Sequence, residues 1–317
     1  MNIYKKVPKP IKEVYRFFKR GVNRVEAEYW GMVIEKNPKK HAEHETRRHK
    51  DILLRPLNLD EPIYFNEKLL WLKYNIYNKS SLIAKCYNKY EVREYVKSKG
   101  LDNILNTLYG AWDNLDDVPW KQLPSECVIK ISNGYAGHVF KRKGEIFNIK
   151  KAKRTLKATK RKYEYYYKIT GDLFVAGTEQ KIICEKMLHS NLGFVAPEDY
   201  KFYCFNGKPM FVEFLADRNG SSDYSYKEVF VDVNLIDRHE LEGEAVAGTF
   251  EKPSCYDEMI EIAKILSADF PFVRVDLYVE NGHPIFGELT FTPNHVQTRE
   301  SEIEMGKLLD LSTAKIM

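Results

Sequence analysis

The stretch from Arg274 to His295, RVDLYVENGHPIFGELTFTPNH, constrains the fold more than any other part of the chain. Apolar and polar residues alternate through its first half, as in a β-strand with one buried face. The turn-forming sequence Glu280-Asn281-Gly282 then leads into a second strand, from Pro284 to Phe291. The stretch therefore predicts an antiparallel hairpin.

The register of this hairpin decides whether its acidic residues meet, because a slip of one residue sends a side chain to the opposite face. With a two-residue turn at Asn281-Gly282 alone, Asp276 and Glu288 point to opposite faces. A three-residue turn sets Arg274 opposite Glu288 instead, and it sets Asp276 opposite Phe286. A two-residue turn followed by a β-bulge also places Asp276 and Glu288 on the same face. In either of these last two arrangements the arginine and the two acids share a face.

Two carboxylates beside an arginine, on a sheet of otherwise apolar residues, make a site of hard oxygen ligands. Such a site suits Mg²⁺, which usually keeps several waters and bridges substrate phosphates. The alternative is an ordinary hairpin with an ion pair at the surface, which contributes little to stability.

The composition allows two domains, or one large α/β body with a smaller appendage, in a chain of 317 residues that is 44% hydrophobic. The sequence has no apolar run long enough to span a membrane. Its basic N-terminus has neither the apolar core nor the small-residue cleavage site of a secretory signal, so we expect none. Its 5 cysteines are irregularly spaced and include no CxxC pair. We therefore expect reduced thiols and a cytoplasmic protein.

Positive charge is concentrated in two clusters. Residues 1–24 contain Lys5, Lys6, Lys9, Lys12, Arg16, Lys19, Arg20 and Arg24 against Glu13 alone, and residues 141–168 form the second cluster. Polyanions are expected partners: nucleotide phosphates, an acidic glycan, anionic lipid heads or nucleic acid. The alternative is a solvated basic face, which we favour slightly for the first cluster.

Residues 1–60 have the pattern of charged helices. Within them His41, His44 and His49 offer a histidine pair at helical spacing, but no cysteine or second acidic pair completes a zinc site, so a solvent-facing helix is the preferred interpretation. Phe65, Leu69 and Leu72 then predict one face of an amphipathic helix.

Two lysines precede features that suit phosphate binding. Residues 84–101 predict one helix that ends at Gly100, with Lys89 at its start. A cation there disfavours the helix unless an anion is held nearby, or unless it projects into water. Lys130 interrupts the apolar run of a predicted strand, just before a loop with Gly134 and Gly137 whose backbone N–H groups could approach phosphate oxygens.

The rest of the chain predicts a basic helix over 150–170, a strand leading to Glu185, and a hairpin turning at Asn206-Gly207. Asp199, Lys201 and Tyr203 share a face of that hairpin. An amphipathic helix follows, with Met259, Ile262 and Ile265 on its apolar side.

In this combination and order, the segments FNEKLLWLK, NKYEVREYV, LPSECVIKISNGYAG, EKML, DYKFYCFNGKP, FVRVDLY and FGELTFTP resemble the ATP-grasp superfamily. More narrowly, they resemble the TupA-like ATP-grasp proteins of surface-polysaccharide and teichuronopeptide gene clusters. The resemblance runs from about Asn58 to Leu311 and leaves residues 1–57 uncovered.

The resemblance implies an α+β chain with the ATP-grasp fold, in which two α+β subdomains clasp ATP behind a helical N-terminal extension. The implied divisions are a basic helical region over 1–60 and a preceding region over 61–125. A small subdomain with the glycine loop would span 126–190, and a C-terminal subdomain with the metal site would span 191–317.

The resemblance also implies roles for individual residues. Lys89 and Lys130 would hold nucleotide phosphates, and Gly134 to Gly137 would close over them. Residues implied at the adenine are Glu185, the backbone of Lys186 and Met187, and Leu188, while Asp199 would hold the ribose. Asp276, Glu288 and Thr290 would bind Mg²⁺, with Arg274 and Lys201 as catalytic residues.

Two positions depart from the family pattern. Thr290 stands where ATP-grasp enzymes commonly have Asn, as is often so in the TupA-like branch, and its neutral hydroxyl puts a second Mg²⁺ in question. The loop Asn133-Gly134-Tyr135-Ala136-Gly137 replaces the usual His-Gly-Ser-Gly and is one residue longer, which bears on loop closure and turnover.

The resemblance implies an ATP-dependent carboxylate–amine ligase that joins an amine to a uronic acid of a capsular or cell-wall glycan precursor. Alternatives are a kinase-type phosphoryl transfer, a glycosyltransferase, and a non-enzymatic adaptor for an acidic polymer. Expected partners are ATP, Mg²⁺, a carboxylate-bearing sugar and an amine, whereas nucleic acid is disfavoured. Peripheral association with the inner face of the membrane, through the basic N-terminus, stays open.

Overall fold

The computed structural model describes residues 9–48, 56–176, 178–217, 227–238, 241, 246–293 and 298–315, with side chains from residue 23 onward except at 48, 246 and 247. The side chains of most of the first basic cluster therefore lie outside the described residues, as do His49, Asn294 and His295. Within these ranges the chain is α+β, as the sequence predicts.

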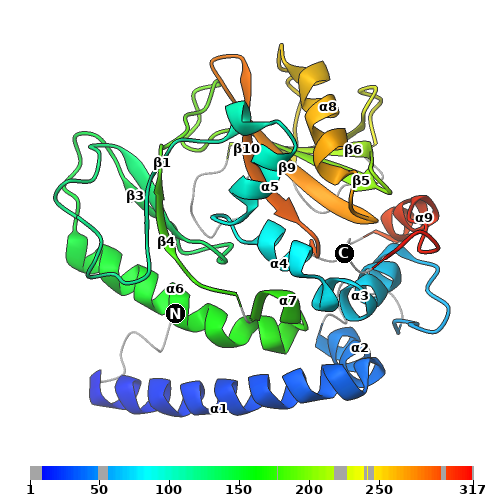
Figure 1. The fold of residues 1–317 in the computed structure, drawn as a ribbon, viewed down its shortest axis with the longest axis horizontal. Coiled ribbons are helices and arrows are strands. Elements are labelled where there is room, and N and C mark those ends of the chain that lie inside the picture. Colours follow the sequence, from blue (N-terminus) through cyan, green and yellow to red (C-terminus); the bar gives the residue numbers. More distant parts are fainter. Residues whose placement is uncertain are drawn as a thin grey trace.

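The strands form two sheets (Figure 1). The four-stranded sheet has the order β1-β4-β2-β3, from β1 (Leu108–Trp112), β2 (Cys127–Ile131), β3 (Val139–Lys141) and β4 (Ile182–Glu185). The six-stranded sheet has the order β10-β9-β5-β6-β7-β8, from β5 (Asp199–Phe205), β6 (Lys208–Ala216), β7 (Lys227–Asp232), β8 (Val246–Ala247), β9 (Phe272–Glu280) and β10 (His283–Thr290). Neighbouring strands are antiparallel except β7 and β8.

One face of the six-stranded sheet packs against α8 (Tyr256–Ser267). The predicted apolar side of this helix is confirmed at Met259 and Ile262, which are buried, but not at Ile265, which is 38% exposed. Leu266 is buried in its place. The opposite face of the sheet is apolar at one end, where Phe272 packs against Phe65 of α3 (Phe65–Asn75), and polar at the other. The polar half holds the candidate site described below.

The four-stranded sheet also has two different faces. Residues alternating from Cys127 to Ile131 pack with Ile182 and Cys184 against α6 (Ile149–Thr170), the predicted basic helix, through Leu156. Val128, Lys130 and Glu185 lie on the other face, as the pairing of β2 with β4 requires. An apolar core therefore anchors a strand whose opposite face is charged.

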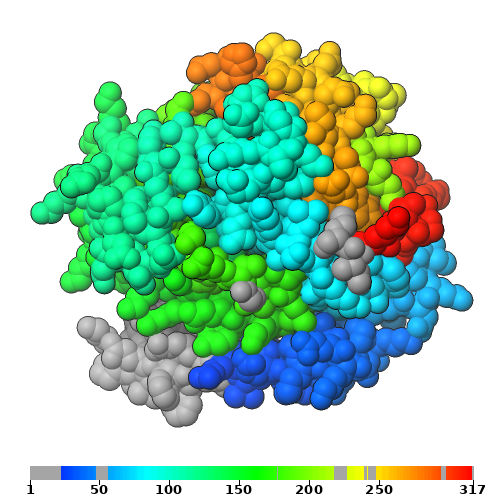
Figure 2. All heavy atoms as spheres, in the orientation of Figure 1, coloured from blue at the N-terminus to red at the C-terminus, as the bar shows by residue number. Residues whose placement is uncertain are grey.

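Short helices connect the two sheets, and cyan atoms of this region cover the middle of the molecule in Figure 2. They are α4 (Ser81–Tyr87) and α5 (Val92–Ser98), with 3₁₀ turns at Tyr77–Lys79 and Asp102–Ile104. Of the other short helices, α7 (Leu173–Ala176) packs against α6 and α4, and α9 (Arg299–Leu308) packs against α3. The single helix predicted over 84–101 is wrong, because a turn separates α4 from α5 and contains Lys89. The predicted end is confirmed: Gly100 follows α5 with a φ of 75°.

The N-terminal region is helical where it is described, as predicted. Helices α1 (Lys9–Lys36) and α2 (Pro38–Arg48) lie along one edge of the molecule, with α1 against α6 (Figures 1 and 2). The expectation that His41 faces solvent is wrong, since it is fully buried. Its Nε2 bonds to the carbonyl oxygen of Ile169 at 2.9 Å and its Nδ1 to the Tyr74 hydroxyl at 2.5 Å, so both ring nitrogens are used in packing.

No helix among the described residues is long and apolar enough to cross a bilayer. All five cysteines are buried and free of disulfides.

Candidate functional site

The acidic hairpin predicted from the sequence forms from β9 and β10. Asn281 and Gly282 have φ values of 53° and 78°, and His283 pairs with Glu280, so the turn has two residues. A bulge between Phe286 and Glu288 then shifts the register.

The bulge moves Glu288 directly opposite Asp276 and Thr290 opposite Arg274. The alternative with a three-residue turn, and its pairings, does not form. The β-bulge alternative is confirmed, and it places the arginine and the two acids on a common face. Gly287 permits the bulge, because a Cβ there would lie 2.8 Å from the carbonyl oxygen of Asp276.

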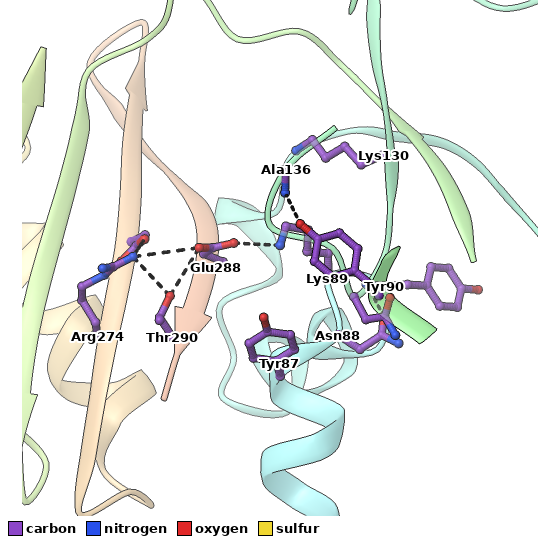
Figure 3. Close-up of polar contacts among 12 residues, drawn as sticks. Tyr87, Asn88, Lys89, Tyr90, Lys130, Ala136, Arg274, Glu288 and Thr290 are labelled. Carbon is purple, nitrogen blue, oxygen red and sulfur yellow. Dashed lines mark hydrogen bonds and ion pairs between the residues drawn. The ribbon is translucent and has the colours of Figure 1, made fainter. Parts of the chain in front are cut away.

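Arg274 holds Asp276 with two parallel hydrogen bonds. The Nε and NH2 groups donate to Oδ1 and Oδ2 of Asp276, both at 2.7 Å. The side chains are 13% and 4% exposed, so the alternative of a surface ion pair is wrong. Arg274 also donates to the Thr290 hydroxyl at 3.3 Å, and this hydroxyl donates to Oε1 of Glu288 at 3.3 Å. Figure 3 shows the side chains of Arg274, Thr290 and Glu288 converging.

Lys89 links this face of the six-stranded sheet to the end of β2 in the four-stranded sheet. Its Nζ lies 2.8 Å from Oε2 of Glu288, and its side chain is 11% exposed (Figure 3). Its backbone N–H donates to the carbonyl oxygen of Ser132 at 2.7 Å, which fixes the turn beside the end of β2. Of the two alternatives for Lys89, the structure supports the nearby anion, and that anion is Glu288.

Lys130 pairs with Glu185 across neighbouring strands at 2.9 Å. Arg93 of α5 lies 3.7 Å from the same carboxylate and was not singled out from the sequence. Beyond Glu185, the backbone of Lys186 donates to Thr107 and accepts from Asn106, both at 2.9 Å.

The second predicted hairpin brings Lys201 to the same face as Arg274. Lys201 pairs with Asp276 on one side and with Glu213 of β6 on the other. Its Nζ donates to Glu213 at 2.9 Å, and the Tyr203 hydroxyl donates to the same carboxylate at 2.7 Å. Sequence reasoning missed Glu213, although a lone acid in the apolar run MFVEFL was a usable signal.

Electrostatics distinguish the carboxylates of this face. Burial raises the pKa of Glu288, but Lys89 and Arg274 together outweigh burial and lower the pKa to about 2. Glu213 behaves alike, because Lys201 and Arg274 outweigh burial and lower its pKa to about 2. Burial instead raises the pKa of Asp276, with Asp199 and Glu288 adding to the effect and Arg274 opposing it.

The glycine loop lies against α6. The Ala136 N–H donates to the Tyr163 hydroxyl at 3.1 Å, and the Tyr135 hydroxyl accepts from Lys162 at 3.1 Å. Gly137 has a φ of 80° and sits so close to α6 that a Cβ would lie 2.0 Å from Oγ1 of Thr159. The backbone at the start of β3 is therefore tightly constrained.

His138, the residue after this loop, was also missed. Its Nε2 is buried and makes no hydrogen bond in the described part of the chain. Burial, followed by the charges of Lys130 and Lys89, lowers its pKa to about 3. A neutral imidazole therefore lies beside the two lysines.

The donor set fits Mg²⁺ in chemical type, with two carboxylates and a hydroxyl on one face. Its oxygens are shared with cations of the chain, Arg274 at Asp276 and Lys89 at Glu288. Over the described ranges, no three His, Cys, Asp or Glu side chains gather as a metal site. Binding a divalent ion would thus require these ion pairs to rearrange.

Solved structures similar to the chain include two D-alanine–D-alanine ligases. The Bacillus anthracis ligase complexed with ATP is 14% identical, with a TM-score of 0.40, over 72% of this chain and 61% of that one. The Helicobacter pylori ligase is 15% identical, with a TM-score of 0.42, over 77% and 69%. An L-amino acid ligase from Bacillus licheniformis is 14% identical, with a TM-score of 0.40, over 68% and 44%. The chain thus spans about six tenths of the Bacillus anthracis ligase.

No curated protein sequence matches the chain. The profile of the family described as TupA-like ATPgrasp matches residues 67–312, which is most of the sequence. The chain therefore belongs to the TupA-like ATP-grasp family.

Proposed function

We propose that the protein is an ATP-dependent ligase that joins a carboxylate to an amine through an acyl phosphate. The observation that supports this most is the ion pair between Lys89 and Glu288. It brings the turn beside the charged four-stranded sheet onto the polar face of the six-stranded sheet. Family membership supplies the expectation that ATP lies between two such units.

The phosphates of ATP would lie between Lys89 and Lys130, two cations held from different elements. Each already pairs with a carboxylate in this structure, Glu288 and Glu185 respectively. A bound triphosphate would replace these carboxylates as the partner of each ammonium group. Gly134 to Gly137 would cover the phosphates once the loop leaves α6.

The rest of the nucleotide would extend along the end of β4. Glu185, with the backbone of Lys186 and Met187, would meet the adenine edge, and Leu188 would contact the ring. Asp199 would hold the ribose at the start of β5. These roles come from the family resemblance, as do the proposed subdomains over 126–190 and 191–317.

Asp276 and Glu288 would hold Mg²⁺, with Thr290 as a third, weaker ligand. Bound there, the ion would neutralise the charge that develops on the transferred phosphoryl group. Arg274 would release Asp276 and turn toward anionic oxygens of the reacting groups, and Lys201 would add positive charge from the next strand.

The reaction needs positioning and charge neutralisation more than a protein nucleophile. An acceptor carboxylate oxygen attacks the γ-phosphorus, the bond from phosphorus to the bridging oxygen breaks, and ADP leaves. The amine nitrogen then attacks the acyl carbon, the carbon–oxygen bond to phosphate breaks, and the nitrogen loses a proton. We propose a uronic acid of a capsular or cell-wall glycan precursor as the carboxylate.

The test is a product assay with Mg-ATP, a panel of uronic acids and a panel of amino acids. A ligase releases ADP and phosphate in equal amounts, and only when both cosubstrates are present. ADP without phosphate would indicate a kinase, and UDP release from a sugar nucleotide would indicate a glycosyltransferase. If nucleotide at 100 times its Kd failed to add the expected ~2.7 kcal/mol of stability, an adaptor would be favoured.

Lys89→Met and Glu288→Gln should each abolish turnover while the protein stays folded. Lys97→Met is the matched control, since Lys97 lies on the neighbouring helix α5 and pairs only with exposed Glu94 in the described structure. Full activity in either site variant, or equal loss in the control, would refute the assignment.

A further inference from the structure

His138 lies close to Lys89 and Lys130, and the family resemblance assigns it no role. It lies between the glycine loop and β3, one residue before Val139. Val139 pairs with Ile129 in the antiparallel ladder, so the next step along the ladder sets His138 against Lys130. Opposed residues share a face, which places the imidazole on the charged side of the four-stranded sheet.

The position of the ring is fixed by its neighbours in sequence. Gly137 is pressed against Thr159 of α6, and Val139 packs with the core of that sheet. His138 cannot turn to the α6 side without displacing these contacts. It therefore faces the region where Lys130, Lys89 and Glu288 all influence its charge state.

The Nε2 atom of His138 is buried without a hydrogen-bond partner among the described residues. A buried polar atom left without a partner is destabilising, and a bound ligand is one kind of partner that can satisfy it. Lys89 and Lys130 direct their ammonium groups to Glu288 and Glu185 instead. A partner that reaches Nε2 beside these two cations, and takes them over from their carboxylates, is expected to be an anion.

We propose that His138 donates a hydrogen bond from Nε2 to a terminal phosphate oxygen of the bound nucleotide, between Lys89 and Lys130. The inference rests on the proposed function and names a third side chain for its phosphate site. A neutral imidazole supplies a directional hydrogen bond to the phosphate without adding a third positive charge. The two lysines supply the charge.

The test compares nucleotide binding to His138→Leu, His138→Gln and the unaltered protein by titration calorimetry. The probes are a non-hydrolysable ATP analogue with Mg²⁺ and, separately, AMP, which has no β- or γ-phosphate. Leucine keeps the bulk and removes the donor, whereas the glutamine amide places an N–H close to the position of Nε2. His283→Leu is the control, because His283 is exposed at the hairpin turn.

We expect His138→Leu to weaken binding of the ATP analogue on the order of tenfold, the scale of one hydrogen bond to a charged group. AMP binding should be unchanged, and His138→Gln should keep most of the affinity for the analogue. Equal analogue affinity in His138→Leu and the unaltered protein would overturn the proposal. A loss shared equally by AMP, or by the glutamine variant, would also overturn it, since it would mark a structural effect.

Failure of the proposed function is distinguishable. In that case the unaltered protein itself would bind neither nucleotide, and both proposals would fall together. If the unaltered protein binds the analogue, the comparison among variants decides the role of His138 alone.

Discussion

At the scale of single residues, Glu213 shows how the polar face is held together. It is a buried carboxylate within an apolar strand, and it satisfies both Lys201 and the Tyr203 hydroxyl. A buried ion pair adds little compared with apolar packing, but losing one partner leaves an uncompensated charge. We therefore expect the removal of Glu213 to lower the stability of the protein strongly.

Glu213→Leu should lower the free energy of unfolding by about 3–5 kcal/mol, because the Lys201 ammonium is left buried without its acid. The measurement is urea unfolding followed by circular dichroism. Glu94→Leu is the control, since its ion pair with Lys97 is exposed, and it should change stability by less than about 1 kcal/mol. Similar values for the two variants would contradict the account of Glu213.

A pH prediction belongs to His41. Burial lowers its pKa to about 4, from an ordinary value near 6.5. Between these values the unfolded chain binds a proton that the folded chain does not, so stability falls as the pH drops from about 6.5 toward 4. The loss from this residue should reach about 3 kcal/mol at most.

The measurement is urea unfolding at pH 7.5 and pH 4.5 for the unaltered protein and for His41→Gln. Removing the imidazole should flatten the dependence on pH, even though the variant is less stable at pH 7.5. An equally steep dependence in both proteins would show that other groups are responsible.

Sequence reasoning singled out residues whose chemistry conflicts with their surroundings. Lys130 interrupts an apolar strand, and Asp276 and Glu288 lie in alternating apolar runs, so each was identified before the fold was known. Arg93 and His138 lie in polar segments, where a charged or aromatic side chain is unremarkable. Only the meeting of distant segments gives those two residues their environment.

At the scale of elements, the two hairpins use the same device. Both turn at Asn-Gly with positive φ values, at Asn206-Gly207 and at Asn281-Gly282. In both, a bulge on the return strand shifts the register by one residue after the turn. The shift brings Glu213 opposite Lys201 and Glu288 opposite Asp276, and without it each acid would face the core side.

This device explains why the strands were predicted more reliably than their pairing. The Asn-Gly dipeptide predicts a two-residue turn. The bulge at Gly287 depends on the close approach of the Asp276 carbonyl, which is a tertiary contact. The break between α4 and α5 is similar, because the Lys89 turn is held by Ser132 from another part of the chain.

The glycine loop gives a prediction at this scale. Gly137→Ala should be more damaging than Gly144→Ala, although the two glycines have nearly the same φ, 80° and 81°. A Cβ at Gly144 meets nothing within 4 Å, whereas one at Gly137 would lie 2.0 Å from Thr159. Backbone strain of about 1 kcal/mol is common to both, and overpacking should add about 1–3 kcal/mol at Gly137 alone.

Thermal unfolding and titration with the ATP analogue are the measurements for this pair. We expect Gly137→Ala to be less stable and to bind the analogue more weakly, since the adjoining His138 would be displaced. If the two alanine variants match in both measurements, the loop is not positioned by its contact with α6.

At the scale of the whole molecule, two sheets with charged faces meet through short connecting helices. Residues 128–185 and 199–290 supply the two sets of side chains, and Lys89 reaches between them from the turn before α5. The periodicity of the sequence predicted the strands, and the family resemblance implied the α+β class. The order of strands within each sheet is fixed by long-range packing and came into view only with the structure.

The N-terminal helices lie outside the part matched by the family profile, yet they pack on it. Trp30 and Ile34 of α1 form a small core with Leu70 and Tyr74 of α3. Trp30→Ala should therefore destabilise this docking by about 3–5 kcal/mol. Hydrogen exchange should rise in α1 and α2 and stay unchanged in β9 and β10. An equal rise in hydrogen exchange in all four elements, or no rise in α1 and α2, would contradict the docked arrangement.

The central claim is that Lys89, Lys130 and the acids of the β9–β10 hairpin surround one triphosphate. The most direct measurement is a crystal structure with Mg²⁺ and a non-hydrolysable ATP analogue. We expect phosphate oxygens on both ammonium groups, Mg²⁺ on Glu288 and Asp276, and loss of the 2.8 Å contact between Lys89 and Glu288. An analogue bound elsewhere, with that ion pair intact, would contradict it.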